Sequence, residues 1–265
     1  PVPVRSASVV AGGRLALAAA PGVALSLALP RLRVVHDRRP PGLAEAVGAP
    51  GANAGLLRAG GGWRAVVLPS LGDVLADLGD GPVAIRSDGR RVAAADDRAV
   101  VVWAVGSPDP VERHDGAPSA LCFTASGALL AAAGASLARP GAPPREGSGI
   151  VALAAASGAP RVAALHGDGS VSVWESEGPA MLARWSPPEG ASAGAALGMS
   201  ADGELVTLGA PEGHAPVAWM LRAADGAPVR SVEGARILAP SPAGDGLLAG
   251  GDWGCAWMRP LEDEE

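Results

Sequence analysis

Four histidines are the side chains of this sequence best suited to metal binding or proton transfer. No neighbouring pair of them has the spacing of a metal-ligand motif. No acidic side chain is obviously shared among them, although a ligating histidine usually hydrogen-bonds to such a group. We therefore expect turn histidines that bond to the local backbone, with a metal site assembled from distant loops as the alternative. The four residues are His36, His114, His166 and His214.

Two further patterns bear on enzyme chemistry. Residues Gly190 to Gly194 read GASAG, the G-x-S-x-G pattern in which a strained strand-to-helix turn presents a serine hydroxyl to a histidine. The segment follows Ser-Pro-Pro-Glu and leads into an apolar strand without a helix, so we do not expect a hydrolase. A phosphate-binding P-loop is excluded because the chain contains no lysine. We expect no catalytic residue, no bound metal and no cofactor.

The composition favours a folded protein that does not bind nucleic acid. Apolar residues make up 48% of the chain and charged residues only 18%, so disorder is not expected over most of its length. Much of the apolar share is alanine, which predicts a thin, closely packed core. The formal net charge of -6 opposes general binding to a phosphate backbone.

The compartment is predicted from the cysteines and from one apolar segment. Cys122 and Cys255 are too few for a disulfide framework and suit a reducing compartment. The segment from Leu15 to Pro30 resembles a secretory signal, but Pro21-Gly22 interrupts it and its apolar residues alternate as in a strand. No apolar run approaches the roughly 18 residues of a membrane-spanning helix. We expect a cytoplasmic protein without membrane contact, from a bacterium whose GC-rich codons favour arginine over lysine.

Tryptophans mark a repeat of about forty residues, the period typical of repeat architectures. Trp103, Trp174, Trp219 and Trp257 each end an apolar or alternating strand, at spacings of 71, 45 and 38 residues. The spacing of 71 leaves room for one further repeat, in which leucine takes the place of tryptophan. Two earlier leucines continue the series. The seven anchors are Leu27, Leu68, Trp103, Leu137, Trp174, Trp219 and Trp257.

Turn signals between the anchors predict short strands. Asp-Gly pairs favour the positive φ that tight hairpins require, and no convincing helical periodicity interrupts the pattern. Gly or Pro cuts even the alanine-rich stretches about every eight to ten residues. The seven pairs begin at Asp80, Asp88, Asp115, Asp168, Asp202, Asp225 and Asp245.

The order of strands and turns resembles that of WD40 repeats. Ala84 to Trp103 (AIRSDGRRVAAADDRAVVVW) follows the family's strand, turn, strand, acidic turn and Trp-terminated strand. Arg161 to Trp174 and Leu247 to Trp257 resemble the second half of such a repeat, and His114 resembles the histidine before the innermost strand. The chain departs from the family in having no Trp-Asp dipeptide at the anchors and no complete His, Ser and Asp set. A related propeller family is the alternative.

This resemblance covers nearly the whole chain and implies an all-β fold. We expect one seven-bladed β-propeller domain over residues 1–265, with four-stranded antiparallel blades. A closed ring avoids the unpaired sheet edges that invite aggregation. The resemblance further implies that Val2 to Arg5 pairs with the last blade to close the ring.

The expected function is a non-catalytic scaffold that binds another protein, as a subunit of a bacterial multiprotein complex. Trp253 is expected either to be exposed at the interface or to fold back onto its blade. A propeller enzyme, a hydrolase or lyase at the central channel, is the alternative; it requires acidic or His side chains where the sequence has mostly Ala, Leu and Val. Because fold alone does not determine function, this step rests on analogy. The expected surface lies where outer strands lead to the next inner strand and comprises His36, Arg38, Arg39, Asp96, Asp97, Arg98, Arg113, His114, Asp115, Glu212, His214, Asp252 and Trp253.

Overall fold

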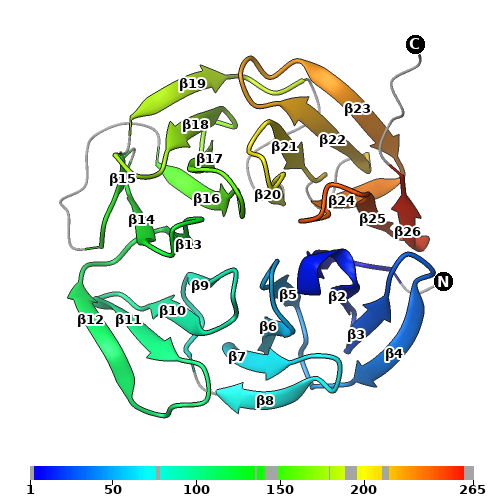
Figure 1. The fold of residues 1–265 in the computed structure, drawn as a ribbon, viewed down its shortest axis with the longest axis horizontal. Coiled ribbons are helices and arrows are strands. Elements are labelled where there is room, and N and C mark those ends of the chain that lie inside the picture. Colours follow the sequence, from blue (N-terminus) through cyan, green and yellow to red (C-terminus); the bar gives the residue numbers. More distant parts are fainter. Residues whose placement is uncertain are drawn as a thin grey trace.

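A computed structural model describes residues 3–75, 78–134, 136–140, 149–178, 180–188, 196–210 and 215–259. Seven small antiparallel sheets stand in a ring, each built from consecutive strands of the chain (Figure 1). The protein is therefore a seven-bladed β-propeller, as the sequence predicts. Within the described residues, the helical structure amounts to the 3-10 turn η1 (Ala11–Gly13).

Each blade runs from an innermost strand at the channel to an outermost strand at the rim (Figure 1). Blade 1 contains β1 (Ser6–Val10), β2 (Leu15–Ala20), β3 (Val23–Ala28) and β4 (Arg33–Arg38). Blade 2 contains β5 (Glu45–Gly48), β6 (Ala54–Ala59), β7 (Gly62–Val67) and β8 (Gly72–Leu75). Blade 3 contains β9 (Val83–Ile85), β10 (Arg91–Ala95), β11 (Ala99–Ala104) and β12 (Pro110–Asp115).

The remaining blades follow the same order. Blade 4 contains β13 (Ala120–Phe123), β14 (Leu129–Ala133) and β15 (Ser136–Ala138). Blade 5 contains β16 (Ile150–Ala155), β17 (Arg161–His166), β18 (Val171–Glu175) and β19 (Met181–Trp185). Blade 6 contains β20 (Leu197–Met199), β21 (Leu205–Leu208), β22 (Val217–Arg222) and β23 (Pro228–Glu233). Blade 7 contains β24 (Ala235–Pro240), β25 (Leu247–Gly251) and β26 (Gly254–Met258), so blades 4 and 7 show three of the four expected strands in the described part of the chain.

The repeat anchors fall on the third strand of the blades. Six of the seven lie within it, and Leu68 directly follows β7. The register varies: Trp103 lies opposite Val92, the second residue of its neighbouring strand, whereas Trp219 lies opposite Leu208, the fourth. In blade 6 the residue opposite the second residue of the neighbouring strand, which is the position of Trp103 in blade 3, is Leu221. Positions two residues apart share one face of a strand, so the spacing predicts the correct strand and face but not always the residue.

Apolar clusters between neighbouring blades form the core. Each of the seven blade interfaces contains buried side chains from both blades. Many of these side chains are alanine, such as Ala93, Ala163 and Ala249, none of which has exposed surface. The sheets therefore approach closely, as the alanine-rich composition predicts.

The ring closes between blade 7 and blade 1, but with less strand pairing than expected. The backbone N–H of Val4 donates to the carbonyl of Gly251, 2.9 Å away, and the next N–H, of Arg5, already bonds to Ala19 in blade 1. Within the described residues, blade 7 contains no strand from the N-terminal segment. The chain passes from blade 7 to blade 1 between Val4 and Arg5, so within the described residues the backbone bond to blade 7 is that of Val4; Val2 lies outside the described residues. Apolar packing of Val4 and blade 1 against Ile237, Ala239 and Leu248 holds this interface.

Most of the Asp-Gly turns have the predicted backbone. Five of these glycines have positive φ: Gly89, Gly116, Gly169, Gly203 and Gly226. Gly81 and Gly246 are not among the described glycines with positive φ. At Gly81 a Cβ would instead overlap the carbonyl oxygen of Ala95, so close backbone approach requires glycine there.

Gly226 allows a direct test of packing between blades 5 and 6. A Cβ at Gly226 would stand 2.6 Å from the ring of Trp185, whose indole N–H donates to the Ala223 carbonyl at 3.1 Å. We expect Gly226→Ala to lower the free energy of unfolding by about 2–3 kcal/mol, from left-handed strain plus the clash. Gly244→Ala is the matched control, because Gly244 has φ 72° against 73° but no atom within 4 Å of its Cβ position. Chemical denaturation that gives equal losses for the two variants would contradict the clash.

No helix in the described ranges is both long and apolar enough to span a membrane.

Candidate functional site

One face of the disc gathers the residues predicted for partner binding. Successive strands of a blade run in opposite directions, so each turn between the second and third strands lies on the face where the chain passes to the next blade. We call this the entry face, because every innermost strand begins there. Those predicted residues that the structure describes lie on the entry face. Some are at the ends of β4 and β12, and the others are in the turns between β10 and β11 and between β25 and β26.

The predicted residues form two separate groups on the entry face. In blade 3 the Asp96–Arg98 turn meets the end of β12, where the Gly116 N–H donates to the Arg98 carbonyl at 2.8 Å. The second group belongs to the adjacent blades 7 and 1, and blade 2 lies between the two groups (Figure 1). Glu212 and His214 lie outside the described residues. The first group comprises Asp96, Asp97, Arg98, Arg113, His114 and Asp115, and the second His36, Arg38, Arg39, Asp252 and Trp253.

Arg38 is held by blade 2. Its guanidinium donates to the Asp73 carboxylate at 2.5 and 2.7 Å and to the Leu71 carbonyl at 2.8 Å. Hydrogen bonding from Arg38 keeps the pKa of Asp73 below its ordinary value. Arg38 therefore joins blades 1 and 2, and three of its N–H donors are used within the protein.

The acidic turn of blade 3 is organised by its own backbone. The Oδ1 atom of Asp96 accepts hydrogen bonds from the N–H groups of Arg98 and Ala99, each at 2.7 Å. These bonds lower the pKa of Asp96. Asp97 and Arg98 are 3.9 Å apart, and their side chains are 85% and 84% exposed. This turn presents both signs of charge to solvent.

Trp253 is both anchored and exposed. Its indole N–H donates to the Gly234 carbonyl at 2.8 Å, and its ring stays 40% exposed. The ring packs closely on two glycines, since a Cβ at Gly234 or Gly251 would stand 3.1 or 3.0 Å from Nε1. Asp252 beside it pairs with Arg236 at 3.3 Å. The two expectations for Trp253 are thus combined, because the ring is fixed to its blade and still offers an apolar face.

The central channel contains a cavity with a volume of about 900 Å³. Innermost strands of all seven blades line it, mostly with Ala, Val, Leu and Ile, as expected from the sequence. Cys122 lines one side, and burial raises the pKa of its thiol to about 12. Both Cys122 and Cys255 are free thiols. The lining of this cavity is largely uncharged, so it offers few side chains that could donate or accept a proton.

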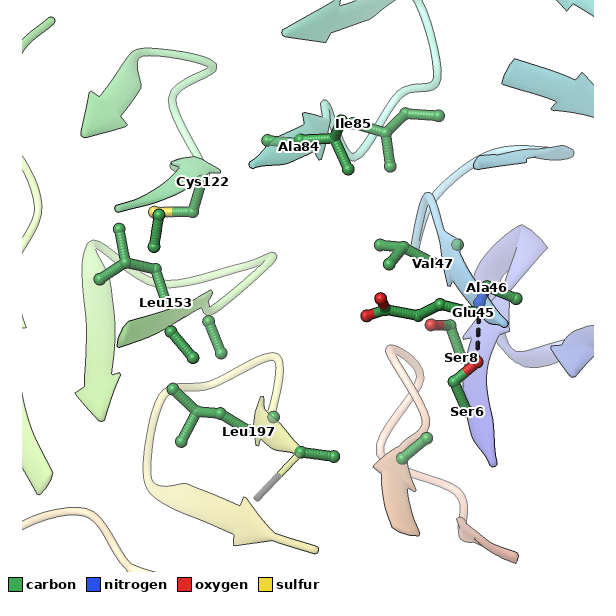
Figure 2. A pocket seen from close by; sticks show the side chains of 18 of the residues that line it. Ser6, Ser8, Glu45, Ala46, Val47, Ala84, Ile85, Cys122, Leu153 and Leu197 are labelled. Carbon is green, nitrogen blue, oxygen red and sulfur yellow. Dashed lines mark hydrogen bonds between the residues drawn. The ribbon is translucent and has the colours of Figure 1, made fainter. Parts of the chain in front are cut away.

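The charged residues of the channel lie at its entry-face end. They sit at or just before the starts of innermost strands, or near the end of β6: Arg5, Glu45, Arg58, Asp80 and Arg236. Glu45 extends from the start of β5 into the open centre (Figure 2). Sequence reasoning missed this residue. Aligning the inner strands would have identified it, because a glutamate begins β5 where other blades have Val83, Ala120 or Leu197.

The histidines differ in environment. His166 is buried, and its Nε2 lies 2.7 Å from the Ser172 hydroxyl, which also accepts the indole N–H of Trp174 at 2.7 Å. This contact of Nε2 with a buried side chain adds to the backbone bonding expected of a turn histidine. His114 lies in β12 with its Nε2 3.4 Å from Glu112. No cluster of metal-ligating side chains occurs in the described part of the chain, and Gly190 to Gly194 lies outside it.

Fold and site together define a class of protein, a β-propeller with an anchored aromatic side chain on its entry face and a largely apolar channel. No protein-family model matches the sequence, and a search of the curated proteins finds no significant match.

Proposed function

We propose that the protein is a non-catalytic docking subunit of a bacterial multiprotein assembly, built on a WD40-like propeller. The observation that carries this proposal is Trp253, a 40% exposed indole fixed in place by a hydrogen bond to Gly234. A fixed aromatic ring loses little conformational entropy on binding, and tryptophan is enriched at interface hot spots. Because the indole N–H is already used, the exposed ring offers apolar contact to a partner.

The kinship to WD40 proteins is supported by local structure. Trp103, Trp174 and Trp257 occupy equivalent places opposite the second residue of the neighbouring strand. The bonded His166, Ser172 and Trp174 are similar in type to the family's buried network, although no aspartate is among the side chains of these two bonds. Two free cysteines support the reducing cytoplasm as the compartment.

The test begins with purification from the native host and identification of the bound protein by mass spectrometry. The partner is then purified, and its affinity is measured by calorimetry. We expect Trp253→Ala to weaken binding by about thirtyfold or more, as for a hot-spot residue worth at least about 2 kcal/mol.

The matched control is Val111→Ala, which removes an exposed apolar side chain from the rim strand β12, 50% exposed. This variant should bind normally. Equal affinity of wild type and Trp253→Ala would remove Trp253 from the interface. A protein recovered alone at native abundance would count against a docking role altogether.

A further inference from the structure

The mouth of the central channel contains a half-buried carboxylate that bonds to no other described residue. Glu45 begins β5 and points into the channel (Figure 2). Among the described residues, its carboxylate makes neither a hydrogen bond nor an ion pair. Burial raises the pKa of Glu45, and the charge of Arg58 opposes this shift without cancelling it. The carboxylate is therefore partly desolvated, and no described residue forms an ion pair with it.

The surroundings of Glu45 suit an apolar stem that ends in a polar group. Across the channel stand Cys122, Leu153 and Leu197, none of them charged (Figure 2). Ser6 and Ser8 of β1 lie beside Glu45, and the Ser6 hydroxyl accepts the Ala46 N–H at 2.7 Å. The Ser6 proton thus remains available as a donor, next to an acceptor carboxylate.

Three arginines line the same mouth and do not neutralise Glu45. Arg236 pairs with Asp252 at 3.3 Å. Arg58 is the register partner of Glu45 on β6, yet the two groups are not within ion-pair distance. Arg5 lies just before β1 with its side chain exposed to solvent, where charge interactions are weakened by water. None of the three arginines therefore forms an ion pair with Glu45.

We propose that the channel mouth binds the basic side chain of a partner peptide, with the Glu45 carboxylate as its counter-ion. This proposal rests on the docking role proposed above and adds the chemistry of the partner. An arginine or lysine side chain has an apolar stem that can lie along the Ala46 and Val47 wall and a charged head that can reach a carboxylate. The net charge of -6 attracts cationic segments toward the disc.

The test uses a defined probe, so it does not depend on identifying the native partner. The peptide acetyl-Ala-Ala-Arg-Ala-Ala-amide is titrated into the full chain and followed by NMR. Its citrulline counterpart has nearly the same shape without the charge. We expect the arginine peptide to bind at least fivefold more tightly than the citrulline peptide, and Glu45→Gln to abolish that preference.

The matched control is Asp80→Asn, which removes one negative charge from the same mouth at an exposed position. Asp80→Asn should retain the preference for arginine. Loss of preference in both variants would reveal a diffuse charge effect and overturn the proposal, as would wild-type protein that does not distinguish the peptides. Equal affinity for n-butylguanidinium and the arginine peptide would assign the site to a small cation and overturn the peptide assignment.

Thermal stability separates loss of binding from loss of folding. Because the folded-state pKa of Glu45 is raised, wild-type stability should fall as pH rises through that pKa. Glu45→Gln should therefore melt higher than wild type at neutral pH, and this advantage should vanish in acid, where the carboxyl is protonated in both folded and unfolded chains. Of the strands packed against β5, β1 and β2 carry no titratable side chain, and β6 carries Arg58. A Glu45→Gln variant that melts lower than wild type at neutral pH would contradict the claim that the partly desolvated Glu45 carboxylate destabilises the folded protein.

The outcomes for this proposal and for the docking role are distinguishable. Failure of the peptide to bind would overturn the basic-side-chain site and leave the Trp253 measurement unaffected. Loss of the Trp253 effect with intact peptide discrimination would instead overturn the docking surface.

Discussion

Replacing Leu17 with alanine is expected to lower the free energy of unfolding by about 3–5 kcal/mol, in the upper range for buried leucines. Leu17 lies in β2 with no exposed surface, in the cluster between blades 1 and 2. Its neighbours are paired strands, so the cavity left by the missing methyl groups cannot easily collapse. Denaturant titration with linear extrapolation measures the loss.

A substitution at Gly55 tests the same contact between blades 1 and 2 from the other side. A Cβ at Gly55 would overlap Cδ2 of Leu17, so Gly55→Ala alone should destabilise the protein. In the Leu17→Ala background the added methyl enters the vacated space, and the double variant should be more stable than the sum of the single effects predicts. Additive losses would show that the two blades do not meet at this point. Leu182→Ala is the control, because Leu182 is 54% exposed on the rim and should cost about 0.5 kcal/mol or less.

Replacing Ser172 with alanine is expected to lower the free energy of unfolding by about 2–4 kcal/mol, although only one oxygen atom is lost. The Ser172 hydroxyl has no exposed surface, and it lies 2.7 Å both from Nε2 of His166 and from Nε1 of Trp174. An indole nitrogen can only donate, so the serine oxygen accepts from Trp174, and it shares a second hydrogen bond with Nε2 of His166 whose donor depends on the histidine tautomer. Alanine would remove a bond from each of these two side chains inside blade 5.

Ser170 provides the comparison for Ser172. Its hydroxyl also bonds to neighbours, at 2.6 Å to Asp168, but this contact is exposed to solvent. Water can replace the lost bond there, so Ser170→Ala should cost less than about 1 kcal/mol. Trp174→Phe combined with Ser172→Ala should show coupling, since both substitutions remove the same hydrogen bond. Equal costs for the two serine variants would mean that the buried network contributes little.

The repeat could be predicted because its signals are local. Asp-Gly turns and alternating apolar residues determine short strands wherever they occur, and tryptophan at Trp103, Trp174 and Trp257 marks the third strand. The tryptophan spacing was a weaker guide in blade 6, where Leu221 rather than Trp219 occupies the equivalent position two residues further along the same face of the strand. The entry face followed from the same logic, because strand direction alone determines on which face a turn lies.

The environment of individual polar side chains could not be predicted in the same way. Arg38 was expected at the partner surface, and the sequence did not reveal that it also pairs with Asp73, 35 residues later in the chain and in the next blade. The contact of His166 with the buried hydroxyl of Ser172 was not foreseen. Glu45 was not singled out at all.

By itself, the sequence determined the number of blades, the alanine-rich core and the face that carries Trp253. These features follow from the local pattern of each repeat and from the number of times that the pattern recurs along the chain. Only the tertiary structure decided which charges are paired and which are not, because closing the ring brings together side chains from different blades. The distances across a blade interface or across the channel depend on the curvature of the whole ring, and no period along the chain encodes that curvature.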